Sequence, residues 1–221
     1  MADGEEVLFE RRGSIAWVTL NRPEKHNAIN DAVRSLLPQR IREAERDPEV
    51  RVIVVGGAGD RAFCAGADIK EFKPAESLVD YRRERISNNW IRAFDDARKP
   101  IVAAIDGYCL GGGLEIALAC DIRIASSASV FALPETGLGM ITGVGGSQRL
   151  VRIVGLGRAL HVMLTGERLS AQQALDFGVV TRVVEQPALL DEARQIAEAI
   201  ATKAPLATEF AKEVLHHGID L

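Results

Sequence analysis

Buried strands alternate with helices along this chain, and that order limits it to one fold class. Apolar runs at 50–56 and 101–105 have the length and β-branched content of buried strands, and each is followed by a helical pattern. Two further strands are expected within 7–20, on either side of Gly13, and others at 121–125 and 179–184. The order predicts an α/β architecture in which helices cover a mostly parallel sheet.

The helical segments carry recognisable boundary signals. Ser170 and Gln173 have the spacing of a capping box, and Pro38 should kink the helix that contains it. Helices are expected at 30–46, 77–97, 112–119, 147–154, 158–164 and 187–202. No long linker, low-complexity tract or charge block divides the chain, so we expect one domain over residues 1–221.

Composition excludes several classes of function. The net charge of −4 gives no global attraction for nucleic acid. The three cysteines have neither disulfide-framework nor zinc-ligand spacing, which favours a reducing compartment and no metal site. The acidic N-terminus lacks the apolar region of a signal peptide, and no apolar run reaches the ~18 residues that span a bilayer. We therefore expect a cytoplasmic protein with no membrane partner.

Two loops share one design, in which a buried strand leads through small residues to the start of a helix. The first runs through Cys64–Ile69 and the second through Leu110–Gly113. Small residues allow a ligand close to the main chain, and helix N-termini leave N–H groups without intrahelical partners. Two such amides aimed at one point would form an oxyanion hole, although the glycines could equally serve only close packing.

Two glutamates strengthen the catalytic interpretation. Glu115 follows Gly113-Leu114 in a segment that is otherwise apolar all round, which is typical of a buried helix. A buried carboxylate needs either partners or a function. Glu135 lies among apolar and turn residues after Pro134. Taken singly, Glu115 could stabilise a helix N-terminus and Glu135 could be a hydrogen-bonding residue at the end of a loop.

Together these segments resemble the successive motifs of the crotonase (enoyl-CoA hydratase/isomerase) superfamily, in the same order and over essentially the whole chain. The matching segments are Asn21-Arg22-Pro23 with Asn27-Ala28, Cys64-Ala65-Gly66-Ala67-Asp68-Ile69-Lys70, Gly107–Glu115, Pro134-Glu135 and Gly143–Leu150. The resemblance implies a spiral of ββα units, with the spiral core at about 1–185 and a helical part at about 186–221. Members of the family usually continue for two or three more helices, so this helical part is expected to be shortened.

The resemblance also implies an activity. A 2-enoyl group carried as a coenzyme A thioester would gain water in syn fashion, as in a hydro-lyase of fatty acid β-oxidation, or lose it in reverse. The backbone N–H groups of Ala67 and Gly112 would hold the thioester oxygen, Glu115 would act as base on the water, and Glu135 would deliver the α-proton. This division needs one ionised and one protonated carboxyl group, which close, desolvated carboxylates achieve by splitting their apparent pKa values. No permanently bound cofactor is implied.

Further positions follow from the same resemblance. Candidate contacts to coenzyme A are Arg22, Lys25, Ala65, Asp68, Ile69 and Lys70, and candidate walls of the acyl pocket are Tyr81, Trp90, Leu114 and Thr142. Thr142 stands where the family usually has proline and adds a hydroxyl near the expected water, while Leu114 is a bulky choice that could narrow the site.

Several alternatives stay open on sequence. A Δ3,Δ2-enoyl-CoA isomerase could work with Glu135 alone, and other lyases of the superfamily share the motifs. A non-enzymatic binding protein of the same fold is disfavoured by the retained glutamate pair, and a Clp-type serine hydrolase by the missing Gly-x-Ser-x-Gly elbow. The acyl chain and its pathway are not encoded in these motifs. Family members assemble as trimers or dimers of trimers, so a homo-oligomer is expected.

Overall fold

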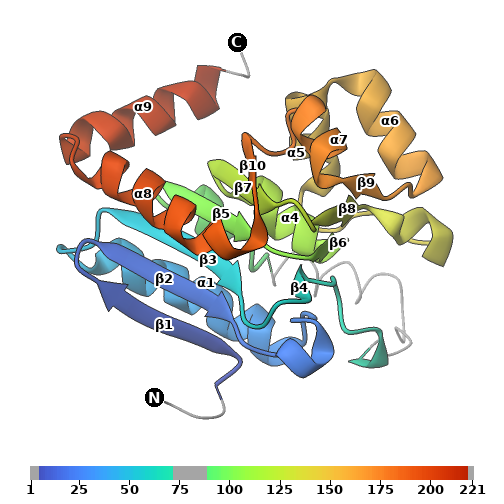
Figure 1. The fold of residues 1–221 in the computed structure, drawn as a ribbon, viewed down its shortest axis with the longest axis horizontal. Coiled ribbons are helices and arrows are strands. Elements are labelled where there is room, and N and C mark those ends of the chain that lie inside the picture. The colour runs from blue at the N-terminus through green and yellow to red at the C-terminus, as the bar shows by residue number, and fades with distance from the viewer. Residues whose placement is uncertain (1–4, 72–88, 219–221) are drawn as a thin grey trace.

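Two sheets organise the protein, for which a computed structural model describes residues 5–71 and 89–218 (Figure 1). The larger sheet has the order β1-β2-β3-β5-β7-β10 and the smaller one β4-β6-β8-β9. The strands of the larger sheet are β1 (Val7–Arg12), β2 (Ile15–Leu20), β3 (Val52–Gly57), β5 (Ile101–Ile105), β7 (Ile122–Ser126) and β10 (Arg182–Val184). Those of the smaller sheet are β4 (Ala62–Cys64), β6 (Tyr108–Leu110), β8 (Val130–Ala132) and β9 (Leu169–Ser170).

Helices connect and cover these strands. The α-helices are α1 (Asp31–Arg46), α3 (Arg92–Asp95), α4 (Gly112–Ala119), α5 (Gly146–Val154), α6 (Leu156–Thr165), α7 (Ala171–Asp176), α8 (Leu189–Ala201) and α9 (Pro205–Gly218). Short 3-10 turns are η1 (Pro23–Lys25), η2 (Ile69–Glu71), η3 (Pro134–Leu138) and η4 (Gln186–Ala188). The helix predicted at 77–97 falls mostly outside the described residues, and α3 is its described part.

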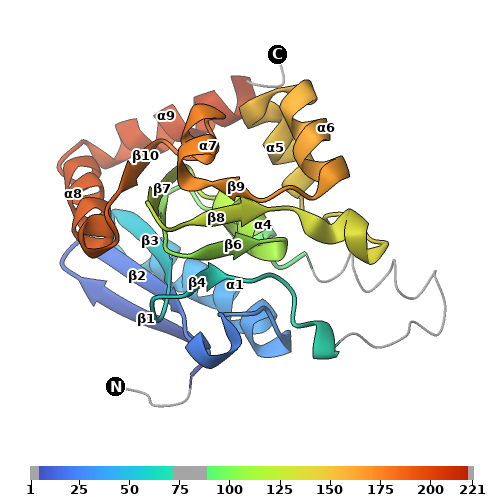
Figure 2. The same ribbon diagram turned by 45° about the vertical axis from the view of Figure 1, so that its right-hand side comes forward.

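Each turn of the chain adds one strand to each sheet. The successive units are β3–β4, then β5–β6–α4, then β7–β8–α5. Within the larger sheet only the β1–β2 pair is antiparallel, and in the smaller sheet β4, β6 and β8 run parallel. Figure 2 shows β4, β6, β8 and β9 lying side by side in that order. The arrangement is the expected spiral of ββα units.

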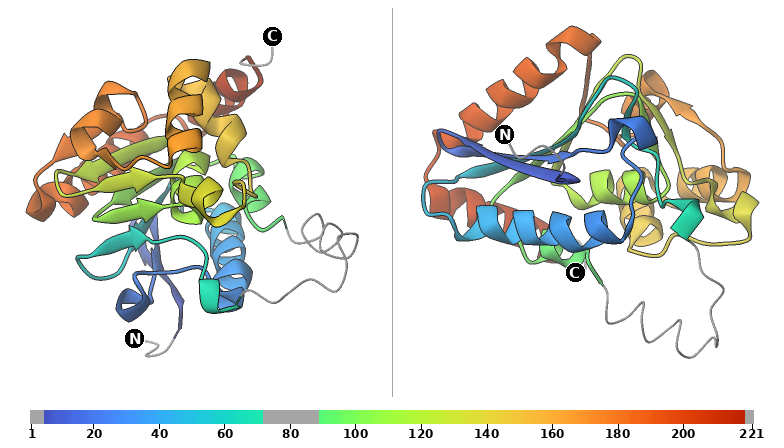
Figure 3. Two further views of the ribbon diagram at one scale, coloured as in Figure 1. Left: turned by 90° about the vertical axis from the view of Figure 1, so that its right-hand side faces the viewer. Right: turned by 90° about the horizontal axis from the view of Figure 1, so that it is seen from below.

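Alternation along the central strands produces two separate cores. In β5, Ile101, Ala103 and Ile105 join the main core with α1 and α4, whereas Val102 and Ala104 pack beneath α8. A strand with apolar residues on both faces is covered on both faces, as parallel strands usually are. The right-hand panel of Figure 3 shows these strands running between α8, above, and α1, below.

Local signals fix most helix boundaries where the sequence placed them. The Asn30 side chain accepts the Val33 N–H at 2.9 Å and caps α1, which continues through Pro38. The Ser170–Gln173 capping box is present with both of its hydrogen bonds. The helix predicted from residue 187 instead begins as the 3-10 turn η4, which contains Pro187, and becomes α-helical at Leu189.

The smaller sheet is the main feature that the strand pattern did not predict. The sequence predicts a loop through Cys64–Ile69, but Cys64 is the last residue of β4, and the strand pattern predicts neither β6 nor β8. These strands are three residues long, and such strands are too short for an alternating pattern to be distinguished from a turn. The expectation of a single covered sheet was therefore incomplete.

The last helix attaches through its polar side. Lys212 Nζ lies 2.8 Å from an Asp121 carboxylate oxygen, and Glu209 pairs with Arg98 at 2.7 Å. Its apolar residues point away from the domain, since Leu206, Phe210 and Val214 are all exposed. Among the described residues, no helix combines the length and apolar character that crossing a membrane requires.

Close packing of α4 on β4 generates a stability prediction. A Cβ on Gly113 would lie 2.2 Å from the Cys64 carbonyl oxygen, so Gly113→Ala must push the helix off the strand. We expect its free energy of unfolding, measured by chemical denaturation, to fall by roughly 3 kcal/mol. Gly157→Ala, in open space on α6, is the matched control and should change stability by less than about 1 kcal/mol. Equal effects of the two substitutions would contradict this packing argument.

Candidate active site

The carboxyl ends of β4 and β6 bring the two small-residue loops together. Cys64 and Cys109 are register partners in these parallel strands, and Ala67 and Gly112 each follow their cysteine by three residues. A Cβ on Gly112 would lie 3.9 Å from the Ala67 nitrogen. The two predicted oxyanion amides therefore belong to neighbouring backbone segments.

Neither of these amides donates a hydrogen bond to another described residue. In the described ranges no acceptor takes the Ala67 N–H, and Gly112 is the first residue of α4, where intrahelical partners are absent. Gly66 and Gly111, which precede them, have φ of 93° and 51°. Such positive values suit glycine, and a Cβ on Gly66 would also lie 2.9 Å from the Leu110 carbonyl oxygen. Two neighbouring N–H groups therefore lack an acceptor within residues 5–71 and 89–218.

The N-terminal motif holds the first of these loops in place. The buried Asn27 side chain donates to the carbonyl oxygens of Ala58 and Ala62 at 3.0 and 2.7 Å and accepts the Arg22 N–H at 2.9 Å. Ile29 donates its N–H to Gly66 O at 2.8 Å and forms a bridge with Ala67. The N-terminal family motif therefore stabilises the loop through Cys64–Ile69.

Glu115 is anchored by one oxygen and open at the other. It lies on α4 with 4% of its surface exposed. Its Oε1 accepts the N–H groups of Val144 and Gly146, both at 2.9 Å, at the start of α5. Its Oε2 has no hydrogen-bond partner in the portion of the chain that the structure describes. A carboxylate held in this way has one fixed orientation and one oxygen left for a ligand or a water.

Glu135 lies in η3, directly after β8, the third parallel strand of the smaller sheet. Its Oε2 is buried and lacks a hydrogen-bond partner among the described residues. Burial raises the pKa of this carboxyl, a hydrogen bond from the backbone of Glu135 itself partly opposes that rise, and the nearby charge of Glu115 adds to it. The net effect is a pKa above that of an ordinary glutamate.

The four predicted catalytic groups come together at one place. A Cβ on Gly111 would lie 3.2 Å from Glu135 Oε1, which sets this carboxyl beside the loop that carries Gly112. Glu115 lies close enough to Glu135 for its charge to raise the pKa of that carboxyl. Carboxyl ends of parallel strands commonly surround ligand sites, and here they supply both amides and one acid.

Residues predicted to contact coenzyme A divide into two groups. Lys25 and Lys70 are exposed, so their ammonium groups are accessible. Arg22 is instead paired with Asp68 at 3.2 Å and with Glu6 at 3.4 Å, so its guanidinium braces the loop. The main-chain N–H groups of the segment are largely occupied: Ala65 donates to His26 O at 3.0 Å, Asp68 to Ile29 O at 2.9 Å, and Lys70 to Asp68 Oδ1 at 3.3 Å. Ile69, at the start of η2, belongs to the same segment.

The predicted acyl-pocket residues are less informative. Tyr81 lies outside the described residues, and Trp90 is half-buried against the main core. Leu114 is fully buried within that core. The Thr142 hydroxyl accepts the Ser147 N–H at 3.2 Å, which ties it to the start of α5. Their role as acyl walls stays a prediction.

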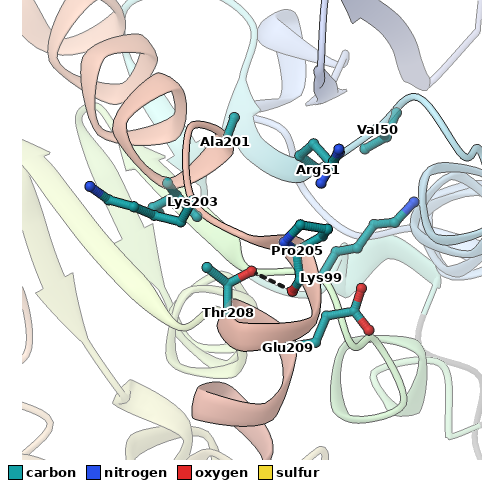
Figure 4. A pocket seen from close by; sticks show the side chains of 9 residues that line it. Val50, Arg51, Lys99, Ala201, Lys203, Pro205, Thr208 and Glu209 are labelled. Carbon is teal, nitrogen blue, oxygen red and sulfur yellow. Dashed lines mark hydrogen bonds between the residues drawn. The ribbon is translucent and has the colours of Figure 1, made fainter.

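A small pocket at the other end of the larger sheet is a different feature. Val50, Arg51, Lys99 and the first residues of α9 line it (Figure 4). Its cavity volume is about 20 Å³, which is room for about one water. Neither glutamate lines this pocket, and it cannot accommodate an acyl-CoA.

The sequence interpretation missed the groups that orient the catalytic side chains. The Val144 and Gly146 amides lie in the quoted Gly143–Leu150 motif, but nothing in their residue types predicts a bond to Glu115. The sequence does contain one indication of this contact, the pair Gly145-Gly146. A Cβ on Gly146 would lie 2.7 Å from Glu115 Cγ. Glycine is required there because the glutamate packs directly against the backbone.

Comparison with known proteins agrees with this geometry. The sequence pattern of "Enoyl-CoA hydratase/isomerase" matches residues 10–221. The chain belongs to the enoyl-CoA hydratase/isomerase family. The short-chain-enoyl-CoA hydratase of Clostridium acetobutylicum is 41% identical over 96% of this chain and 82% of its own length. The (E)-benzylidenesuccinyl-CoA hydratase of Thauera aromatica is also 41% identical, over 97% of this chain and 84% of its own.

Solved structures give the same assignment to the enoyl-CoA hydratase/isomerase family. The enoyl-CoA hydratase of Bacillus anthracis superposes with a TM-score of 0.91 at 37% identity, covering 98% of this chain and 84% of that one. The carnitinyl-CoA hydratase of Mycobacterium avium superposes with a TM-score of 0.85 at 38% identity, covering 96% and 80%. The crotonase fold expected from the motifs is confirmed.

The raised pKa of Glu135 predicts a pH-dependent stability difference. The folded pKa lies above the ordinary 4.5, so the folded state binds the proton more tightly, and wild-type stability falls as pH rises from about 4.5 through the folded value. The Glu135→Gln variant has no carboxyl at this position, so this fall in stability with rising pH does not occur in it. Thermal unfolding between about pH 4 and about pH 8 should show the variant's advantage in Tm growing with pH. The exposed Glu24→Gln controls for loss of one charge, and a Tm difference independent of pH would contradict the prediction.

Proposed function

We propose that this protein is a hydro-lyase that adds water across the double bond of a 2-enoyl-CoA thioester, or removes it in reverse. The observation that carries the proposal is the placement of two backbone amides that have no acceptor among the described residues beside Glu115, which is buried, and Glu135, whose Oε2 is buried. Family membership and the named hydratases among its relatives support the same reaction.

The amides of Ala67 and Gly112 bind the thioester oxygen. Because they are part of the folded backbone, they need no reorganisation when negative charge develops on that oxygen. The two hydrogen bonds polarise the thioester carbonyl, which withdraws electrons from the conjugated double bond and makes Cβ electrophilic. The enolate-like state formed after attack is stabilised by the same two N–H groups.

Glu115 is the base on the attacking water. Its Oε1 is occupied by the Val144 and Gly146 amides, so Oε2 is the oxygen that receives the water proton. The water oxygen forms its bond to Cβ while the π electrons of the double bond move toward the thioester carbonyl. A carboxylate at the start of α5 is also favoured by the partial positive charge of a helix N-terminus.

Glu135 is the acid. Burial, and after it the charge of Glu115, raises the pKa of its carboxyl, and in its protonated form it donates a proton to Cα as the enolate collapses. The balance is complete, since one water has supplied OH to Cβ, Glu135 has supplied H to Cα, and Glu115 carries the proton of the water. Proton exchange with solvent then restores both acids.

The exposed ammonium groups of Lys25 and Lys70 are placed to bind the phosphates of coenzyme A, as point charges do. In the Ala65–Lys70 segment, the carbonyl oxygens of Gly66 and Asp68 already accept the N–H groups of Ile29 and Glu71, so the other main-chain carbonyl oxygens of the segment are the candidates to accept hydrogen bonds from coenzyme A. Arg22 and Asp68 act by bracing this segment. Thr142, Trp90 and Tyr81 are assigned to the acyl pocket on the family resemblance alone.

The proposal also includes the cofactor requirement, the cellular location and the oligomeric state of the enzyme. No permanently bound cofactor is needed, because every proton transfer is made by the two glutamates. A cytoplasmic location is supported by the free, buried Cys64, Cys109 and Cys120. Apolar residues spaced by four along α6 (Leu156, Leu160, Leu164) are exposed and support a homo-oligomer.

Separate substitution of the two acids tests the reaction type. Hydration of crotonyl-CoA, followed by loss of the enoyl absorbance, should fall by at least about 10²-fold in both Glu115→Gln and Glu135→Gln. An isomerase that works with Glu135 alone would tolerate Glu115→Gln when assayed on a 3-enoyl-CoA. That outcome, together with weak hydration by the wild type, would replace the hydratase proposal with isomerisation.

Removal of one oxyanion donor tests the other half of the site. Ala67→Pro deletes an N–H that bonds to nothing within the described chain, so no internal hydrogen bond is lost. We expect kcat to fall by about 10²–10³-fold. Circular dichroism and thermal unfolding identify a correctly folded variant. Unchanged turnover in such a variant would show that the Ala67 amide does not contact the thioester.

A further inference from the structure

The turn that orients Glu115 is itself held by a side chain to which the mechanism has assigned no part. Arg149 Nη1 donates to the Val144 carbonyl oxygen at 2.9 Å, within the turn whose Val144 and Gly146 amides bind Glu115 Oε1. Arg149 lies one helical turn into α5, so its side chain reaches back over the start of its own helix. The glutamate, the turn and the guanidinium thus form one hydrogen-bonded chain.

The position of Arg149 contradicts the usual electrostatics of helices. Residues near a helix N-terminus are preferably acidic, since the helix dipole is positive there, and a cation costs up to about 1 kcal/mol. The first turn of α5 contains no acidic residue of its own. A residue that breaks a local rule in this way is a candidate for a functional role.

The turn is shaped to admit the guanidinium. Gly145 has φ of 95°, and a Cβ there would lie 2.3 Å from Arg149 Nη1. Only glycine allows both the backbone angle and the close approach. Two separate features, the glycine and the misplaced charge, therefore point to the same contact.

An ion pair with Asp95 fixes the guanidinium from the other side. Arg149 Nη2 lies 2.5 Å from Asp95 Oδ1 at the end of α3. The arginine side chain is 18% exposed and the aspartate side chain 50%. A planar guanidinium that binds a carboxylate through one nitrogen and a carbonyl through another has little freedom to rotate.

We propose that Arg149 is a positioning residue for Glu115, with Asp95 as the group that sets the orientation of its guanidinium. The inference rests on the proposed function. Arg149 holds the Val144–Gly146 turn so that both amides face Glu115 Oε1 and Oε2 faces the water. Asp95, which is remote in sequence and exposed at the surface, acts on the chemistry only through this arginine.

The role separates two reactions of one active site. Activation of water needs Glu115, whereas exchange of the α-proton of a saturated acyl-CoA with solvent needs only Glu135 and the two oxyanion amides. Loss of Arg149 should therefore damage the first and spare the second. A purely structural role would reduce both in proportion to the folded fraction.

The test uses Arg149→Met, which keeps the aliphatic stem and removes the donors, and Asp95→Asn. For Arg149→Met we expect kcat for crotonyl-CoA hydration to fall by about 10–100-fold with KM changed less than about threefold, because substrate binding uses other groups. Exchange of the butyryl-CoA α-proton in D₂O, followed by NMR, should stay within about twofold.

Arg40→Met is the matched control. Arg40, on α1, is a similarly half-buried arginine that pairs with Glu5 and Glu43. It is far in sequence from the catalytic residues. It should leave hydration and exchange unchanged, and thermal unfolding records any loss of stability in each variant.

Coupling between the two positions completes the design. If Asp95 works through Arg149, Asp95→Asn should lower hydration in the wild-type background and have no effect in the Arg149→Met background. Equal loss of hydration and exchange in Arg149→Met, or independent effects of the two substitutions, would overturn the inference. A wild type that exchanges the α-proton but does not hydrate would instead overturn the proposed function, and the two failures are therefore distinguishable.

Discussion

The parallel pairing of β4 with β6 is the constraint on which the candidate site depends. Cys64 and Cys109 are register partners, both are fully buried, and the third residue after each cysteine carries a predicted oxyanion amide. Gly113 packs directly on the Cys64 carbonyl oxygen, so α4 is seated against the same strand. The amide of Ala67, the amide of Gly112 and the side chain of Glu115 therefore share one rigid support. The hydrogen bonds of the Asn27 side chain to the backbone of Arg22, Ala58 and Ala62 stabilise the segment that leads into β4.

The two acids differ because their surroundings differ. Glu115 is deeply buried yet accepts two backbone N–H groups, whereas Glu135 has a buried oxygen without a partner. A buried oxygen without a donor disfavours the charge of its carboxyl group, and a charged neighbour disfavours it further. In the proposed mechanism these surroundings give opposite roles to two residues of the same type. This assignment needs neither a metal ion nor a difference in residue identity.

The sequence predicted the parts of the molecule whose signals are local or long. The strand at 101–105 and the helix at 112–119 appear as expected, because an apolar run and a glycine-led helix start are readable from neighbouring residues. The family motifs identified Glu115, Glu135, Ala67 and Gly112, which the fold brings together. The three-residue strands β4, β6 and β8 were not predicted, because their stability comes from pairing rather than from pattern. The bond from Val144 to Glu115 joins residues far apart in sequence, and no residue type encodes a main-chain donor.

In the proposed mechanism the carbonyl is held by main-chain nitrogens just beyond the ends of two paired strands, and this has an evolutionary consequence. The pairing of the strands, which repeats at ~4.8 Å, positions those nitrogens, so their placement depends little on which side chains the loops carry. Sequence drift can then reshape the region that receives the acyl group without weakening the polarisation of the thioester. Laboratory evolution of new substrate range should accordingly find its productive changes in side chains facing the acyl group, and should leave the glycines that shape the two loops untouched.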